Sequence, residues 1–197
     1  GVAGPGDPLA NEETFTTFEL IDREFPHLIK CMSTNGLLLP ELLEWLDALG
    51  LCSVTVTMNA LDPRVAARIY SHVRYHGRCY TGPEAGEILI ANQLAGIKKA
   101  ARRGMTVKVN TVLIPGVNDD QVQPVARKVK ELGAAVMNVM PLIPQAEFAG
   151  FAPPSPELLE EVRRTNEGII GQFKHCRQCR ADAVGLIGQD VKLAEHG

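Results

Sequence analysis

Short apolar runs alternate with amphipathic stretches along this chain, and the alternation predicts strands separated by helices. The runs rich in apolar and β-branched residues, which predict strands, are residues 1–3, 28–32, 53–58, 106–113 and 135–140. The stretches with apolar residues at helical spacing, which predict helices, are residues 13–25, 39–49, 83–103, 118–133 and 157–173. Residues 70–82 fit neither period, and we expect them to form an irregular insert.

This order implies an α/β fold of parallel strands joined by right-handed crossovers and covered by outer helices. Ligands of such folds bind where the strands end at their carboxyl side. Polar or glycine-rich segments fall at these predicted ends, at residues 4–7, 31–35, 59, 110–119 and 138–141. The pattern favours a partial (β/α) barrel, with a doubly wound sheet as the alternative. We expect residues 1–150 to form the barrel core and residues 151–197 to add a helix and tail to the same domain.

Composition narrows the class of protein. Of the 197 residues, 45% are hydrophobic and 22% are charged, as in ordinary globular proteins. The formal net charge of −3 and the lack of a long apolar run give no indication of nucleic-acid binding or membrane insertion. Five cysteines, an odd number, favour a reducing cytoplasm over a disulfide framework. The chain begins inside a predicted strand end, so we expect a further N-terminal segment that these residues do not include.

Cys176 and Cys179 form a C-x-x-C pair. Two thiolates at this spacing can reach one metal ion or one iron–sulfur cluster, but either group usually takes more protein ligands. At least one further ligand must therefore come from elsewhere. A zinc knuckle or a redox-active dithiol is the alternative for this pair.

Five segments, in order along the chain, resemble the radical S-adenosylmethionine (SAM) enzymes, and most closely those of nitrogenase cofactor biosynthesis. The segments are residues 4–11 (GPGDPLAN), 31–36 (CMSTNG), 108–119 (KVNTVLIPGVND), 138–143 (NVMPLI) and 175–183 (HCRQCRADA). The resemblance implies a partial (β/α) barrel of the radical SAM type whose first βα unit is missing. The family's C-x-x-x-C-x-x-C motif, which binds the SAM-cleaving [4Fe-4S] cluster, does not occur in these residues. We therefore expect this fragment not to cleave SAM.

The resemblance also implies which residues bind SAM: Gly4, Pro5, Gly6, Asp7, Ser33, Thr34, Asn35, Asn59, Asn110, Ile114, Val117 and Met140. Residues 4–7 would meet the methionine amino group, and residues 114–117 would approach the adenine by main-chain and apolar contacts. Structural alternatives stay open. Asp7 can cap a helix, Ser33 to Asn35 can stop a strand, and the amides of Asn59 and Asn110 can serve the fold alone.

Cys31, Cys176 and Cys179 are implied to hold substrate [4Fe-4S] clusters, with Cys31 at a central strand end serving a different cluster from the pair. In this family's reaction two such clusters fuse, with a SAM-derived carbide and an added sulfur, into an eight-iron precursor. Cluster donors and a downstream carrier are the implied partners. For Cys31 the alternative is a buried small side chain.

Two other functions remain open at this point. In a zinc-stabilised scaffold domain, Cys176 and Cys179 would be structural. In a barrel lyase, Lys108 would form a Schiff base with a carbonyl substrate. The insert contains His72, His76 and Cys79, for which the family gives no role, and we expect a surface or lid position. Cys52 begins a predicted strand and is expected in the core.

Overall fold

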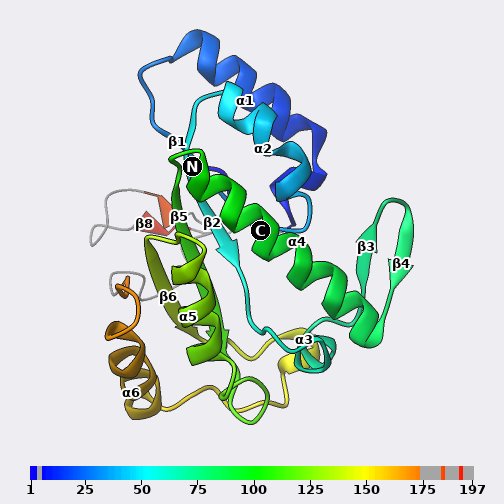
Figure 1. The fold of residues 1–197 in the computed structure, drawn as a ribbon, viewed down its shortest axis with the longest axis vertical. Coiled ribbons are helices and arrows are strands. Elements are labelled where there is room, and N and C mark those ends of the chain that lie inside the picture. The colour runs from blue at the N-terminus through cyan, green and yellow to red at the C-terminus, as the bar shows by residue number, and fades with distance from the viewer. Residues whose placement is uncertain (4–5, 174–182, 185–190, 193–197) are drawn as a thin grey trace.

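A computed structural model describes residues 1–3, 6–173, 183–184 and 191–192, and its centre is a parallel sheet (Figure 1). The sheet contains β1 (Lys30–Thr34), β2 (Leu51–Thr57), β5 (Thr106–Leu113) and β6 (Val136–Pro141), in that spatial order. All three pairings are parallel. The strands predicted at residues 28–32, 53–58, 106–113 and 135–140 are therefore confirmed to within two residues at both ends.

Both edges of the sheet continue through single bridges. Val2 forms a parallel bridge with Met32 and exchanges hydrogen bonds with its neighbours, from Val2 N to Cys31 O (3.0 Å) and from Ser33 N to Val2 O (2.9 Å). At the other edge Gln172 forms a parallel bridge with Met137. The strand predicted at residues 1–3 is thus only a bridge, and the described sheet has four strands rather than the expected five.

Helices cover one face of the sheet (Figure 1). Every second strand residue is buried against them, as the full burial of Val54, Val56, Val107 and Val109 shows. The covering helices α2, α4 and α5 place Leu39, Ile97, Val125 and similar residues in the same core. The described helices are η1 (Pro8–Ala10), α1 (Glu12–Glu24), α2 (Leu39–Ala48), α3 (Pro63–Ile69), α4 (Gly82–Arg102), α5 (Val122–Glu131), η2 (Ala146–Phe148) and α6 (Pro156–Glu167). None of them is long and apolar enough to cross a membrane.

Several elements differ from the prediction. The insert is regular and forms an antiparallel hairpin, β3 (Val73–Tyr75) and β4 (Arg78–Tyr80), which projects beside the start of α4 (Figure 1). Its turn uses positive φ angles at His76 (48°) and Gly77 (73°), the conformation of two-residue hairpin loops. Helix α3 was not predicted. Helix α6 ends at Glu167 instead of residue 173, because the following residues turn back to reach β6.

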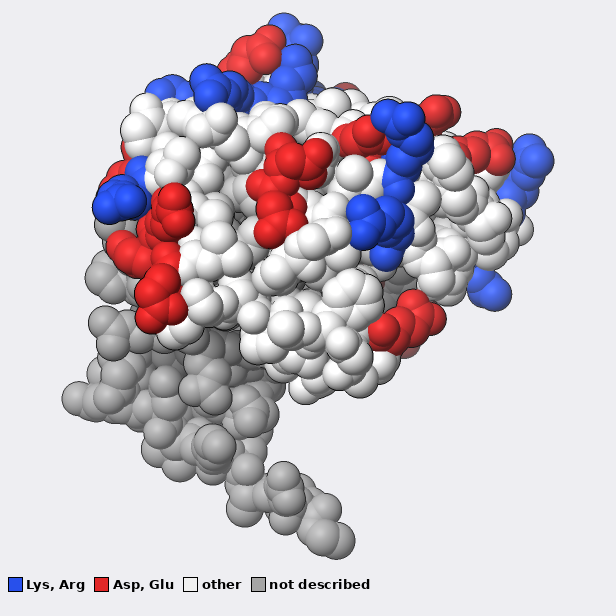
Figure 2. Space-filling model, turned by 90° about the horizontal axis from the view of Figure 1, so that it is seen from below, with Lys and Arg blue, Asp and Glu red and all other residues white. Residues whose placement is uncertain are grey.

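A second short pair, β7 (Ala183–Val184) and β8 (Val191–Lys192), is antiparallel. Seen from below in Figure 2, acidic and basic side chains are interspersed over the described surface, without a field of one sign. The view therefore gives no indication of a nucleic-acid site on this face.

Candidate functional site

The face of the sheet opposite the buried valines carries polar side chains. Successive strand residues point to opposite faces, so the positions that alternate with the buried apolar residues share this face. Register aligns them in rows across the strands. One row contains Ser33, Thr55 and Lys108, and the next contains Thr57, Asn110 and Asn138. We call these six residues the polar face.

Asp7 ties the N-terminal loop to the end of β1. Its carboxylate accepts hydrogen bonds from Leu9 N (3.0 Å) and Asn35 N (2.5 Å), and Thr34 Oγ1 lies 2.9 and 3.0 Å from its two oxygens. The structure thus brings together three of the predicted residues. It also confirms the alternative interpretation, because Asp7 is the N-cap of η1. Of the same predicted loop, Gly4 and Pro5 lie outside the described residues, and exposed Gly6 has a φ of 126°.

The loop after β1 is fixed from behind by α4. The buried side chain of Gln93 donates from Nε2 to Asn35 O and to Thr57 O, both at 2.8 Å. Gly36 has a φ of 84° and lies against Gln93, so the chain turns here without room for a side chain. The ends of β1 and β2 are therefore held at a fixed separation.

Asn110 and Asn138 face each other across β5 and β6. Asn138 Nδ2 lies 3.4 Å from Asn110 Oδ1, a long contact. Asn138 is fully buried, and its Oδ1 has no hydrogen-bond partner in the part of the chain that the structure describes. Because a buried amide oxygen without a partner is costly, this atom indicates a missing donor. Asn138 was not among the predicted site residues, since only the strand register shows that two asparagines are paired.

Asn59 serves the fold through both ends of its amide. Its Oδ1 accepts from Val112 N (2.9 Å), and its Nδ2 donates to Tyr70 Oη (2.9 Å). Burial raises the pKa of Tyr70 to about 12. Asn59 itself is 6% exposed. These hydrogen bonds confirm that the amide of Asn59 serves the fold, the alternative that the sequence left open.

The loop after β5 is organised by Asn118. Ile114 N donates to Asn118 Oδ1 (2.8 Å), and Asn118 Nδ2 donates to Asn59 O (2.9 Å) and Val112 O (2.8 Å). The helix predicted from residue 118 begins four residues later, because Gln121 precedes the first residue of α5. The amide of Asn118 is instead used within and between loops.

Three predicted SAM contacts lie near this loop. Ile114 and Val117 are buried and pack with Leu142, whereas Met140 is half-buried on β6 opposite Val112. The side chains of Ile114 and Val117 therefore stabilise the loop, and its main chain remains the part that could approach a ligand.

Cys31 lies on the same side of β1 as Ser33, half-buried. The expected position at a strand end is wrong, because β1 runs on to Thr34 and Cys31 is its second residue. A Cβ at Gly1 would lie 3.1 Å from Cys31 Sγ, so the two residues pack closely. Cys176 and Cys179 lie outside the described residues, and their assignment remains a prediction.

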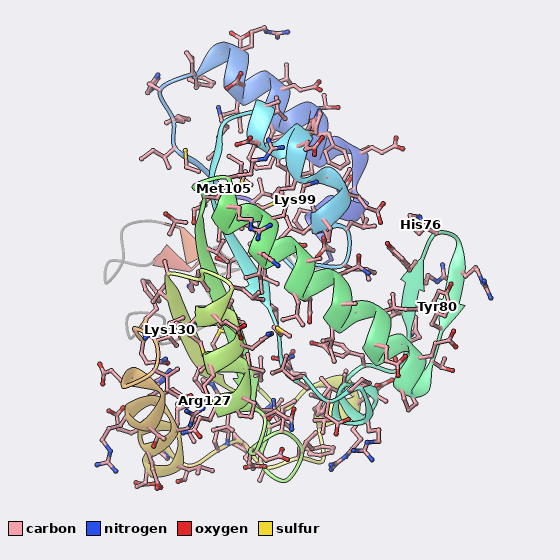
Figure 3. The ribbon with its side chains drawn as sticks, in the orientation of Figure 1. His76, Tyr80, Lys99, Met105, Arg127 and Lys130 are labelled. Atoms are coloured by element: carbon pink, nitrogen blue, oxygen red, sulfur yellow. The ribbon has the colours of Figure 1, made fainter. Side chains whose placement is uncertain are left out.

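The remaining cysteines and histidines that the structure describes do not form a metal centre. No group of three His, Cys, Asp or Glu side chains able to hold a metal occurs among the described residues. Cys52 is exposed, so its predicted core position is wrong; Cys79 is exposed as expected. His72 is exposed. His76 lies on the projecting hairpin (Figure 3), and its Nε2 is 3.2 Å from Oε1 of Glu41 on α2.

Lys108 occupies the polar face, and its Nζ lies 4.2 Å from the centre of the Phe173 ring. This cation–π contact gives the lysine a structural role.

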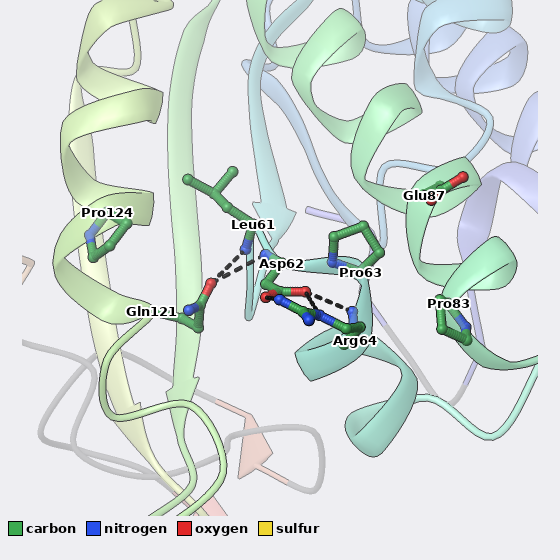
Figure 4. A pocket seen from close by; sticks show the side chains of 8 residues that line it. All are labelled: Leu61, Asp62, Pro63, Arg64, Pro83, Glu87, Gln121 and Pro124. Atoms are coloured by element: carbon green, nitrogen blue, oxygen red, sulfur yellow. Dashed lines mark hydrogen bonds and ion pairs between the residues drawn. The ribbon is translucent and has the colours of Figure 1, made fainter.

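Two pockets flank the strand ends. One of about 240 Å³ is lined by Asp7, Asn35, Tyr70 and residues of the hairpin. A larger one of about 660 Å³ lies where α3, α4 and α5 begin and contains none of the predicted residues (Figure 4). There Gln121 Oε1 accepts from Leu61 N and Asp62 N, and Arg64 lowers the pKa of Asp62 by hydrogen bonding. The first pocket fits the predicted site better, because it adjoins the hydrogen bonds that join Asp7 to Thr34 and Asn35.

Comparison with known proteins gives the family. Residues 2–129 match the Radical SAM superfamily, which is more than half of the chain, and the chain therefore belongs to this superfamily. The fold agrees. A radical SAM methyltransferase from Sphaerobacter thermophilus superposes with a TM-score of 0.63 at 22% identity, covering 85% of this chain and 48% of that one. A domain of the pyruvate-formate lyase-activating enzyme from Bacteroides vulgatus gives 0.60 at 16% identity, covering 88% and 97%. These likenesses confirm the α/β fold with parallel strands and outer helices.

Within the superfamily, the chain is similar to the FeMo cofactor biosynthesis protein NifB. It is 46% identical to NifB of Klebsiella pneumoniae over 197 residues, covering 96% of this chain and 42% of that protein. It is 47% identical to NifB of Methanocaldococcus jannaschii over 195 residues, covering 99% and 65%. The chain thus spans between two fifths and two thirds of the length of these relatives.

Proposed function

We propose that this chain is the barrel part of a radical SAM enzyme of nitrogenase cofactor biosynthesis that acts as NifB does. The observation that carries the proposal is the identity of 46–47% to two NifB proteins over almost the whole chain. The loop that Asp7 joins to Asn35, directly after β1, supports it, since ligands bind at the carboxyl ends of the strands in this class of fold. Among the described residues, no observation favours the lyase or the scaffold alternative.

The described residues fit SAM. SAM carries an amino group, a carboxylate, ribose hydroxyls and an adenine, so it needs both donors and acceptors. The polar face offers hydroxyls, amides and the unpartnered Asn138 Oδ1. Asp7 and the main chain of residues 33–35 would orient the methionine end, with Asn110 and Asn138 beneath the nucleoside. When bound to a reduced [4Fe-4S] cluster, SAM supplies a 5′-deoxyadenosyl radical.

The proposed substrates are two [4Fe-4S] clusters. Cys31 would hold one of them, and Cys176 with Cys179 would hold the other, each with ligands from outside this chain. The product would be an eight-iron cluster that contains a carbide from SAM and an added sulfur. Iron–sulfur donors would deliver the substrates, and a carrier protein would accept the product, in the cytoplasm.

The test uses the full-length protein that contains this chain, reconstituted anaerobically with iron and sulfide. We expect 5′-deoxyadenosine on reduction with SAM, and SAM binding about tenfold weaker in Asn138→Leu, which removes one hydrogen-bonding amide. Asn166→Leu is the matched control, because Asn166 is 1% exposed and its Oδ1 is also unpartnered among the described residues, but it lies on α6. Equal SAM affinity in wild type and Asn138→Leu would refute the site, and absence of 5′-deoxyadenosine would refute the reaction class.

A further inference from the structure

The smaller of the two pockets lies beside the strand ends but is separate from the polar face. None of the polar-face residues is among the residues that line it. Its apolar lining includes Leu37, Leu38, Val73 and Leu89, from the loop after β1, the hairpin and α4. Its volume of about 240 Å³ is below the usual range of pockets for drug-sized ligands. The pocket therefore suits a molecule much smaller than SAM.

The oxygen acceptors of this pocket are already in use. The carboxylate of Asp7 accepts hydrogen bonds from Leu9 N, Asn35 N and Thr34 Oγ1. The side-chain oxygen of Asn35 accepts from Leu37 N at 2.8 Å. Both side chains thus serve the chain itself, and the three donors spread the negative charge of Asp7.

The donors of the pocket, in contrast, are available. The hydroxyl of Tyr70 accepts from Asn59 Nδ2 at 2.9 Å, and its own proton has no acceptor among the described residues. Burial raises the pKa of Tyr70 to about 12, so the hydroxyl keeps this proton at neutral pH. Two residues further on, His72 Nδ1 lies 3.2 Å from Ser71 Oγ, which leaves Nε2 for a ligand.

Arg74 adds a positive charge to the same wall. It lies on β3, and its side chain forms no ion pair or hydrogen bond within the part of the chain that the structure describes. Tyr70, His72 and Arg74 are alternate residues of the segment that leads into the hairpin, and all three line the pocket. A hydroxyl, an imidazole and a guanidinium around one space are donors that suit a carboxylate or another oxyanion.

The other arginine of the hairpin has a different environment. Arg78 pairs with Tyr75 in the strand register, and its guanidinium carbon lies 5.3 Å from the centre of the Tyr80 ring. Both arginines are exposed, but Arg78 does not line the pocket. The hairpin therefore offers a matched pair of arginines, of which Arg74 alone borders this space.

We propose that the smaller pocket is a separate ligand site, which binds a short aliphatic carboxylate through Tyr70, His72 and Arg74. The apolar side chains of the lining hold the aliphatic part of the ligand, and they favour an organic acid over phosphate or sulfate. The inference goes beyond the proposed function, because it adds a ligand other than SAM next to the loop that Asp7 joins to Asn35.

The experiment measures ligand affinity by calorimetry in the full-length reconstituted protein. Pentanoate is the probe, pentanamide is its neutral counterpart, and inorganic phosphate is an anion without an apolar part. Arg74→Gln removes the charge, Tyr70→Phe removes one donor, and Arg78→Gln is the control on the same hairpin. S-adenosylhomocysteine is titrated with and without pentanoate.

We expect pentanoate to bind about tenfold or more tightly than pentanamide or phosphate, because only pentanoate combines a charge with an apolar chain. Arg74→Gln should weaken pentanoate binding by about tenfold or more, as for the loss of a charged hydrogen bond, and Tyr70→Phe by about two- to tenfold. Arg78→Gln should change it by less than about twofold, as for an exposed charge outside the site. S-adenosylhomocysteine should bind wild type and Arg74→Gln with equal affinity, whether or not pentanoate is present.

Four results would overturn the inference. Equal losses in Arg74→Gln and Arg78→Gln would show only a general effect of charge, and phosphate binding as tight as that of pentanoate would show an inorganic-anion site. Displacement of pentanoate by S-adenosylhomocysteine would assign the pocket to the SAM site. Absence of pentanoate binding in wild type would remove the site altogether. Because Arg74 is exposed, Arg74→Gln decides the matter even where Tyr70→Phe lowers stability.

Discussion

Gly36→Ala tests the packing that positions the loop after β1. Gly36 has a φ of 84°, and a Cβ placed there would lie 2.8 Å from Val56 Cγ1 and 3.0 Å from Gln93 Cγ. The left-handed conformation costs a non-glycine residue about 1–2 kcal/mol. Overpacking of a dense core adds about 1–3 kcal/mol, so the free energy of unfolding should fall by about 2–5 kcal/mol in total.

Gly104→Ala is the matched control. Gly104 has a φ of 80°, but a Cβ there would meet no described atom within 4 Å. It should therefore lose only the conformational term of about 1–2 kcal/mol. Urea unfolding followed by far-ultraviolet circular dichroism would measure both changes, provided that the two variants share one m-value. Equal losses of stability in the two variants would refute the reasoning, because they would show that Val56 and Gln93 do not confine position 36.

Three further predictions follow from single groups. The unfolded chain should lose the Tyr70 proton near pH 10, whereas the folded chain keeps it until about 12. The contribution of Tyr70 to the free energy of unfolding is therefore complete below pH 10 and is lost as the pH rises to 12. Urea unfolding of Tyr70→Phe at a series of pH values should lack this part of the fall in stability. Lys30 is 6% exposed and pairs with half-exposed Asp22, so Asp22→Asn should lower the unfolding free energy by about 1–3 kcal/mol, while an unchanged denaturation midpoint would contradict this pairing. The 197-residue chain alone contains no C-x-x-x-C-x-x-C motif and should release no 5′-deoxyadenosine after iron–sulfur reconstitution, as chromatography of the reaction would show.

The sequence predicted the strands of the sheet well, because burial on one face imposes strict alternation. The range predicted for β5, residues 106–113, matches the structure at both ends. The hairpin was missed because each of its strands has only three residues, too few to show a period, although His76 and Gly77 form a typical two-residue turn. Length of the element, more than its type, decided what could be predicted.

The candidate site was predicted only in part. Residues 7, 34 and 35 were named, and the structure joins them through one carboxylate. Asn138 could not be singled out, since its pairing with Asn110 depends on strand register. Asn118 begins a predicted helix in the sequence, and only its tertiary contacts with Asn59 and Val112 show its buried role. Polar residues at strand ends are visible in a sequence, but which of them meet is decided by the sheet.

The most direct test of the central claim follows the methyl carbon of SAM. The full-length protein would be loaded with two substrate clusters and given SAM labelled with ¹³C in the methyl group. The iron-containing product would then be isolated anaerobically and examined by pulsed electron paramagnetic resonance and iron analysis. We predict an eight-iron cluster that contains the labelled carbon, formed together with 5′-deoxyadenosine. SAM cleavage without labelled carbon in an iron cluster would contradict the proposed reaction.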